Sequence, residues 1–205
     1  LKTIDQLMIY PPEWIPNPVK WSNFIEALQV LPFHLYFKNT MIIVLTNLAA
    51  ALLSSSLVAY GFARIEFPGR EVLFTIMLST LMMPYIVRMI PLYLIYSKLK
   101  WIDTFLPLIV PNFFGVPYYI FLLRQFFRTV PEELADAARI DGCSELGIWW
   151  RVMLPLSKPA MAVIGIFCFQ THWNDFLGPL IYLNNVNLRT LALGLYAFRE
   201  IGRAS

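Results

Sequence analysis

The sequence predicts an all-α membrane protein, a polytopic bundle of transmembrane helices, from its apolar composition and from four long stretches with almost no charge. Of its 205 residues, 58% are hydrophobic and only 14% are charged, whereas about 25% of the residues in soluble domains are charged. A helix needs about 20 mainly apolar residues to cross a bilayer. Four stretches reach that length: residues 39–63 and 104–123 carry no charge, residues 72–97 carry only Arg88, and residues 159–183 carry only Asp175.

The first predicted span, residues 39–63, carries two groups of small side chains, at 49–51 and 54–56. Small side chains on a membrane helix let a neighbouring helix approach closely. A short turn then leads to the second predicted span, which Pro84 and Pro91 interrupt.

The third predicted span, residues 104–123, contains Pro107, Pro111 and Pro117. Each proline in a membrane helix frees a backbone carbonyl, which neighbouring groups or water must then satisfy. We therefore expect this span to be buried in protein, where it could line a cavity. The fourth predicted span follows at residues 159–183.

The spans are predicted to belong to one helical domain. In chain order it comprises an extracytoplasmic segment (1–37), three spans (38–125), a charged segment that we expect to be cytoplasmic (126–158), a fourth span (159–183), and an extracytoplasmic loop with the start of a truncated last span (184–205). The first segment is proline-rich, and we expect it to be extended with a short helix near residues 21–28. Because the chain begins with Leu1 and ends without completing an apolar span, we expect both ends to be truncated.

Lysine and arginine residues favour cytoplasmic loops, so their distribution bears on orientation. One set of alternate loops, which includes the charged segment, holds Arg64, Arg70, Arg124, Arg128, Arg139, Arg151 and Lys158. The other loops hold Lys98, Lys100, Arg189, Arg199 and Arg203. The larger group favours a cytoplasmic charged segment, and the smaller group weakens that bias.

The charged segment holds eight charged residues between Glu132 and Lys158, and its sequence predicts two short helices. Thr129 and Glu132 match a capping box at the start of the first helix, with a proline in the first turn. Gly142 stands where a left-handed residue ends a helix. Ser144 is placed to cap the second helix, which Pro155 is expected to stop.

Helices this short are marginal alone and need a surface to pack against. Two surfaces fit at this point. One is the membrane, with the acidic edge of Glu132, Glu133 and Asp136 in water. The other is a protein partner, which the acidic edge favours because anionic lipids attract lysine and arginine instead.

The run PEELADAARIDGCSELGIWWRVMLPLSKPA closely resembles the EAA loop of bacterial ABC-transporter permeases. That family's pattern is Glu-Ala-Ala, then a glycine after a short gap, then an apolar residue followed by Leu-Pro. The matching positions are Asp136, Ala137, Ala138, Gly142, Met153, Leu154 and Pro155. Two positions depart from the pattern: Asp136 replaces the usual glutamate, and Cys143 stands where alanine is usual.

Further stretches are similar to the sugar-type, maltose-like branch of these permeases. They are the opening PPEWIPNPVKWSNFIEAL, the turn from Arg64 to Gly69, and WNDFLGPLIYLNNVNLRTLALGL (Trp173 to Leu195). This resemblance implies the permease subunit of an ATP-driven importer that carries a sugar or related polyol across a bacterial or archaeal cell membrane. It also implies one further transmembrane helix at each end of the chain.

The resemblance implies several partners: a dimer of ABC ATPase subunits, a second permease subunit, an extracytoplasmic solute-binding protein and the surrounding lipid. ATP and magnesium would bind to the ATPase, with no cofactor on this chain. The residues implied to dock on the ATPase are Glu133, Asp136, Ala137, Ala138, Asp141, Gly142, Leu154 and Pro155. The segment from Asn184 to Phe198 is similar to the part that contacts the binding protein, with Asn184, Asn185, Asn187 and Arg189 as candidate contacts.

Polar side chains in the predicted spans are candidates for a substrate pathway: Ser54, Ser55, Arg88, Asn112, Tyr118, Tyr119, Gln170 and Asn174. Amides and hydroxyls can bind sugar hydroxyls, tyrosine offers a flat face to a pyranose ring, and a charge within a span is a functional hint. Hydrogen bonding between helices is the favoured explanation of the same polar residues. Snorkelling towards the interface is the alternative for Arg88.

Other functional classes have weaker support. His172 and Asp175 have the spacing of one helical face, which could suit an acid/base pair or a metal in a membrane-embedded enzyme. The 205 residues hold no GxSxG, HExxH or GxxxxGK[ST] motif, and no basic run that would indicate nucleic acid. An importer of a non-sugar solute, an ion channel and a membrane scaffold remain as alternatives.

Overall fold

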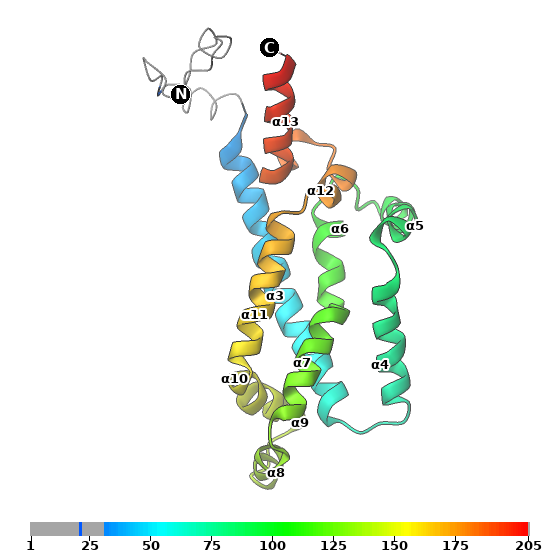
Figure 1. Ribbon diagram of the computed structural model, residues 1–205, viewed down its shortest axis with the longest axis vertical. Coiled ribbons are helices and arrows are strands. Elements are labelled where there is room, and N and C mark those ends of the chain that lie inside the picture. Colours follow the sequence, from blue (N-terminus) through cyan, green and yellow to red (C-terminus); the bar gives the residue numbers. More distant parts are fainter. Residues whose placement is uncertain (1–20, 22–30, 205) are drawn as a thin grey trace, which may run out of the picture.

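The computed structural model describes Trp21 and residues 31–204, and every regular element in that part of the chain is a helix (Figure 1). The all-α prediction is therefore confirmed. The extended segment and the short helix expected before residue 31 lie outside the described residues, apart from Trp21.

The first predicted span is one long helix, α3 (Phe33–Arg64, 32 residues). It contains no proline, so its backbone hydrogen bonds can continue over about 48 Å at 1.5 Å per residue. Buried residues such as Val44, Ala51 and Ala59 face the bundle, where α3 packs mainly against α7 (Pro117–Thr129) and α11 (Lys158–Trp173). The helix thus forms the centre of the fold.

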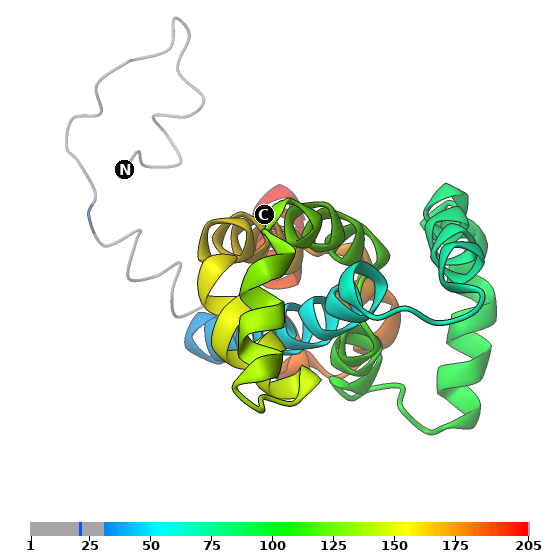
Figure 2. The same cartoon turned by 90° about the horizontal axis from the view of Figure 1, so that it is seen from below.

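The second predicted span is broken. It consists of α4 (Arg70–Ser79), η1 (Thr80–Met82) and α5 (Tyr85–Lys98). A bend of 100° separates the two parts at Pro84, because a proline disfavours the helical conformation of the residue before it. Pro91, by contrast, lies inside α5 without ending it. Both ribbon views show α4 and α5 on one side of the bundle (Figures 1 and 2). There α4 contacts α7, and α5 packs on α12 (Leu177–Tyr182) through Tyr96 and Tyr182.

The third predicted span is also interrupted, as its prolines indicated. It comprises α6 (Leu106–Ile109), η2 (Val110–Phe114) and α7, with Gly115 between them at a φ of +86°. All three prolines lie in the first turns of these helices, where a missing N–H costs no hydrogen bond. Together the 24 residues from Leu106 to Thr129 are long and apolar enough to cross a membrane.

The charged segment forms α8 (Glu132–Ile140), α9 (Glu145–Ile148), the π-helical turn η3 (Trp149–Met153) and α10 (Leu154–Leu156). An 81° bend at Ser157 then turns the chain into α11. This segment lies at the end of the molecule opposite α5, α12 and α13 (Figure 1).

The fourth predicted span, residues 159–183, is shorter than expected, because α11 ends at Trp173 and residues 174–176 separate it from α12 (Leu177–Tyr182). The predicted binding-protein loop is also only partly a loop. Within Asn184–Phe198, η4 (Val186–Leu188) precedes α13 (Leu191–Ala204), which packs on α3.

By length and apolar composition, α3 and Leu106–Thr129 could each cross a membrane alone. Two bent pairs meet the same criteria if each is counted as one span: α4–η1 with α5, and Glu145–Leu156 with α11. The fourth crossing therefore draws on the charged segment in this count, which the sequence had placed outside the membrane.

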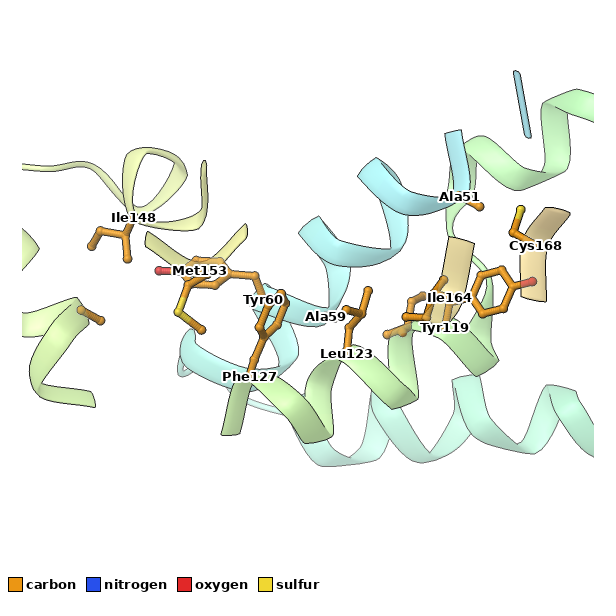
Figure 3. Close-up of a cluster of buried hydrophobic side chains, with 12 residues drawn as sticks. Ala51, Ala59, Tyr60, Tyr119, Leu123, Phe127, Ile148, Met153, Ile164 and Cys168 are labelled. Atoms are coloured by element: carbon orange, nitrogen blue, oxygen red, sulfur yellow. The ribbon is translucent and has the colours of Figure 1, made fainter. Parts of the chain in front are cut away.

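One large cluster of buried side chains joins the charged segment to the spans (Figure 3). Its members come from α3, α7, the charged segment and α11: Ala51, Ala59, Tyr60, Tyr119, Ile120, Leu123, Phe127, Ala135, Ile148, Met153, Ile164 and Cys168. A smaller cluster near the opposite end holds Ile43, Tyr96, Leu108, Tyr182 and Leu183.

Candidate functional site: the charged segment and the polar midsection

The turn between α8 and α9 has the geometry predicted from Gly142. Gly142 has a φ of +81°, which a residue with a side chain rarely adopts. Its N–H donates to Arg139 O at 3.0 Å, and the N–H of Cys143 donates to Ala138 O at 2.9 Å. This pair of bonds is the Schellman arrangement that ends a helix. The next helix begins as predicted, with the Ser144 hydroxyl accepting from the N–H of Gly147 at 3.3 Å.

The predicted capping box at the start of α8 is wrong. Helix α8 begins at Glu132 directly after Pro131, with no side-chain cap. Thr129 still belongs to the last turn of α7, and its hydroxyl donates to Phe126 O at 2.7 Å. Thr129 is therefore occupied by the preceding helix and does not cap α8.

Pro155 was predicted to stop the second helix, and this is wrong. Helix α10 continues to Leu156, and the break follows at Ser157. The π-helical turn η3 stands directly before Leu154. A proline ring clashes with the carbonyl four residues earlier in a regular α-helix, and a wider π turn is a common way to relieve such a clash.

The predicted docking residues divide into an exposed group and a partly covered one. Glu133, Asp136, Ala137, Asp141, Gly142 and Pro155 are exposed, while Ala138 and Leu154 are half-buried. The exposed apolar side chains Leu134 and Ile140 lie on the same short helix, at 45% and 86% exposure. Helix α8 is thus anchored mainly by Ala135, which is 2% exposed, and presents the rest of its surface outward.

A network of charged side chains connects α8 and α9 to α3. Arg139 donates to Asp136 Oδ1 at 2.7 Å and to Glu145 Oε1 at 2.9 Å, while the Tyr60 hydroxyl donates to Glu145 Oε2 at 2.5 Å. Hydrogen bonds from Arg139 and then Tyr60 lower the pKa of the Glu145 carboxyl. Bonds to Glu145 and then Asp136 raise the pKa of the Arg139 guanidinium above its usual range.

Asp136 is expected to pair with the ATPase, and within this chain its carboxylate pairs with Arg139. The side chain of Asp136 is nevertheless 57% exposed. Its second oxygen has no hydrogen bond to the described residues, so the carboxylate can still accept from a further donor.

Two other arginines bind backbone carbonyls at this end of the bundle. Arg64 Nη2 donates to Phe127 O at 2.8 Å and, over a short contact, to Val130 O. Arg124 donates to Phe62 O at 3.1 Å and to the carboxylate of Glu71 at 2.5 Å, which holds α4 against α3 and α7. From the sequence, both arginines were expected to be loop charges, and Arg64 also belongs to the turn that resembles the sugar-type permeases. Their roles depend on residues more than 50 positions away.

A second group of polar side chains, here called the polar midsection, lies where α3, η2 and α11 meet and consists of Asn47, Asn112 and His172 with the neighbouring Ser54 and Ser55. Its amides, imidazole and hydroxyls bind one another and backbone groups. Asn47 donates to Leu108 O at 3.0 Å, and Asn112 Nδ2 donates to Asn47 Oδ1 at 2.7 Å. His172 Nδ1 lies 2.8 Å from Cys168 O, so it carries the proton. His172 Nε2 is then the acceptor that Asn112 approaches at 3.2 Å. This network links α3, α6, η2 and α11.

Ser54 and Ser55, predicted to contact substrate, bind backbone groups of the broken third span. The Ser54 hydroxyl shares its proton between Ala50 O of its own helix at 2.7 Å and Asn112 O at 3.0 Å, and the Ser55 hydroxyl accepts from the N–H of Val116 at 3.0 Å. The expectation that neighbours satisfy this span's backbone is thus met by α3. For these two serines, helix–helix bonding is what the structure shows.

Four of the other predicted pathway residues line one groove. Tyr118 and Tyr119 from α7 face Gln170, Thr171 and Asn174 at the end of α11, around a groove of about 440 Å³. Arg88 and Asn112 line a separate groove of about 420 Å³ that also includes His172 and Asp175. The candidate pathway residues therefore fall into two neighbouring grooves that meet at Thr171.

The proposed enzyme pair does not form in this structure. Asp175 lies beyond the end of α11, where its Oδ1 accepts from the N–H of Gly178 at 3.1 Å. Within the described residues no ion pair within 4.0 Å joins it to His172. In the same part of the chain, no group of three or more His, Cys, Asp or Glu side chains could hold a metal ion.

Two residues that the sequence did not mark as functional, Asp103 and Asn39, hold the candidate binding-protein contacts in place. Asp103 Oδ1 accepts from the N–H groups of Asn184 and Asn185, at 3.0 Å and 2.7 Å. Asn39 donates to the backbone carbonyls of Asn187 and Arg189, at 2.7 Å and 3.0 Å. The side chains of the three asparagines in the loop are exposed, and Arg189 is half-buried.

Comparison with known proteins places this geometry in a family. Residues 51–200 match the model of the family described as "Binding-protein-dependent transport system inner membrane component". The chain is 30% identical to the sulfoquinovosyl glycerol transport system permease protein SmoH of Agrobacterium fabrum, over 97% of this chain and 70% of that protein. It is 36% identical to the arabinooligosaccharides transport system permease protein AraQ of Halalkalibacterium halodurans, over 88% of this chain and 64% of that protein.

A solved structure of an ABC transporter has the same fold. A chain in the crystal structure of a bacterial ABC transporter involved in the import of the acidic polysaccharide alginate matches with a TM-score of 0.81 and 25% identity, over 93% of this chain and 66% of that one. The chain thus spans about two thirds of the length of these relatives. With its helical membrane fold, it belongs to the family of binding-protein-dependent transport system inner membrane components.

Proposed function

We propose that this chain is the permease subunit of an ATP-driven importer for a sugar or related polyol delivered by a solute-binding protein. The observation that carries the proposal is α8, a short helix that exposes Asp136 and Ala137, is followed by the exposed Gly142, and lies at one end of an otherwise apolar bundle (Figure 1). Such a helix needs a partner surface. The partner is a dimer of ABC ATPase subunits that binds ATP and magnesium, while this chain binds neither.

The importer would contain a second permease subunit and lie in the cell membrane of a bacterium or archaeon, crossing it several times. Wide apolar exposure on α3, α4 and α5 supports this arrangement, including Leu45, Val72 and Ile86 at 55%, 63% and 70% exposure. Side chains of that kind are stable against lipid or another helix bundle. The charged segment would face the cytoplasm, and the loop at Asn184–Arg189 would face the binding protein.

The groove between α7 and α11 is the proposed part of the solute pathway. Tyr118 offers a ring that is 44% exposed, and Gln170 and Asn174 are exposed on the facing helix. Aromatic faces combined with amides suit the alternating apolar faces and hydroxyl edges of a sugar ring. Sulfoquinovosyl glycerol, arabinooligosaccharides and alginate, named for the relatives, are carbohydrates of this general kind.

The substitution Gly142→Asn tests the docking role. Asparagine tolerates a positive φ better than most residues, and nothing lies within 4 Å of the added Cβ in the free chain. The side chain would instead meet the ATPase surface. We expect at least a tenfold loss of ATPase association, about 1.4 kcal/mol, with membrane insertion unchanged, measured by co-purification and uptake in reconstituted vesicles.

Gly69→Asn is the matched control, since Gly69 has a φ of +83° and equally open surroundings. It lies in the turn between α3 and α4, outside the charged segment, so we expect it to retain association and uptake. Normal uptake by Gly142→Asn, or equal losses in both variants, would contradict the proposed docking site.

A further inference from the structure

Two side chains near the end of α3 hold the charged segment from inside the bundle. Tyr60 and Arg64 are four residues apart, so they lie on the same face of the helix. Tyr60 is 2% exposed, and the side chain of Arg64 is 7% exposed. At such burial water competes little for hydrogen bonds, so these bonds are stronger than surface ones.

Arg64 binds the place where the charged segment leaves α7. One guanidinium nitrogen donates to the carbonyls of Phe127 and Val130, and the other lies 4.0 Å from Glu132 Oε2. The last turn of α7 and the first turn of α8 are therefore both attached to a single side chain of α3.

Tyr60 binds the segment at a second place, where α9 begins. Its hydroxyl donates to Glu145 at 2.5 Å. Its ring packs edge-on to Phe127 with 6.5 Å between ring centroids, in the cluster that also holds Ile148 and Met153 (Figure 3). Two separated attachments prevent rotation of the segment relative to α3, which a single attachment would allow.

From Glu145 the bonds continue outward to the exposed surface. Arg139 links Glu145 to Asp136, and the side chains of these residues are 33%, 44% and 57% exposed. A continuous chain of hydrogen bonds therefore runs from the surface of α8 to a buried tyrosine of α3.

Helix α3 does not adjoin the charged segment in sequence, because α3 ends at Arg64 and α8 begins at Glu132. Helices α7 and α11 adjoin the segment in sequence, so a displacement of the segment moves them through the chain itself. By contrast, more than 60 residues separate Arg64 from Val130. Yet α3 holds the broken third span through Asn47, Ser54 and Ser55. Its movement would therefore alter the groove-forming part of the bundle.

We infer that Tyr60 and Arg64 are positioning residues that make α3 and the charged segment move as one body when the ATPase displaces that segment. This inference rests on the proposed function. It assigns the transmission of movement to two side chains of α3, in addition to the chain connections of α7 and α11.

Tyr60→Phe tests the inference, because it removes only the hydroxyl and keeps the ring in the core. The measurement is solute taken up per ATP hydrolysed by the complete importer in vesicles. We expect ATPase association and hydrolysis to be retained while this ratio falls by about tenfold, since the lost bond is to a charged group. Tyr93→Phe is the control, a tyrosine on α5 that is 38% exposed.

A distance measurement separates transmission from a purely structural role. Spin labels at Ile140 on α8 and Leu45 on α3, both exposed, are introduced after Cys143 and Cys168 are replaced. In the otherwise unaltered chain, the distance between labels should be the same in the nucleotide-free and ATP-trapped importer. In Tyr60→Phe it should differ between the two states.

The outcomes distinguish this inference from the proposed function. If the unaltered chain recruits no ATPase, the proposed function is overturned and the inference with it. If the unaltered chain couples hydrolysis to uptake and Tyr60→Phe does so equally well, with an unchanged label distance, the inference alone is overturned.

Discussion

The charged segment and the polar midsection both hold helices together in an apolar bundle, but they do so with different chemistry. Near the charged segment, arginines and carboxylates connect α3, α4, α7, α8 and α9, and the carboxylates are 44% to 65% exposed. In the midsection, amides, a histidine and hydroxyls connect α3, α6, η2 and α11, without a carboxylate or guanidinium among them.

The difference follows from access to water. A charge removed from water loses several kcal/mol of solvation, so ionic bonds suit the end of the bundle where carboxylates stay partly hydrated. Neutral amides lose less on burial and can satisfy one another fully. The comparison therefore indicates that the charged end can bind a partner through its hydrated carboxylates, while the midsection holds the spans together away from water.

The largest stability effect should come from Arg64→Met. The substitution keeps an apolar stem but removes the bonds from Arg64 to Val130 O and to Phe127 O, which keeps only the N–H of Val130 at 3.3 Å. Hydrogen bonds to charged groups contribute about 1.5–3 kcal/mol each. We expect a loss of about 3 kcal/mol, measured as a lower Tm in detergent. Arg151→Met, at an exposed arginine of the charged segment, is the control and should change Tm little.

An intermediate effect is expected from Asn47→Leu in the midsection. It removes the donor to Leu108 O and the acceptor for Asn112, and side-chain bonds between membrane helices contribute about 1–2 kcal/mol in model systems. Thr46→Val, at the neighbouring position of α3, is the control. If Asn47→Leu lowers Tm more than Arg64→Met does, the ranking of the two regions is reversed.

The smallest effect is the pH dependence of the Glu145 interaction. Because its folded-state pKa is lowered, Glu145 contributes stability above the ordinary glutamate pKa of 4.5, and this is lost as pH falls further. Its side chain is 44% exposed, so the contribution is at most about 1 kcal/mol. The Tm difference between the unaltered chain and Glu145→Gln should be constant near pH 7 and shrink below pH 4.5. A difference that persists at low pH would contradict an ionic origin.

Local features of the chain were predicted well because they depend on neighbouring residues. Gly142 ends α8 and Ser144 caps α9 through bonds that span only a few positions. The prediction for Thr129 was wrong although it was also local. The Thr129 hydroxyl donates to Phe126 O within α7, and Thr129 belongs to the last turn of that helix, so it does not cap α8.

The prolines show where local rules end. Pro84 separates α4 from α5 with a 100° bend, while Pro91 lies inside α5 and Pro155 inside α10. The same ring lacks the same N–H in all three cases. Whether a helix breaks depends on how the surrounding turns adjust and what packs against them, which no short pattern of residues contains.

By itself, the sequence determined the apolar spans, the exposed charged segment and its two short helices, because hydrophobicity, caps and glycine conformation act along the chain. Only the tertiary structure decided which side chains connect the helices. Tyr60 meets Glu145 across 85 residues, and Asn39 meets Asn187 across 148. A long-range hydrogen bond forms only where packing brings donor and acceptor together, and packing is a property of the whole bundle.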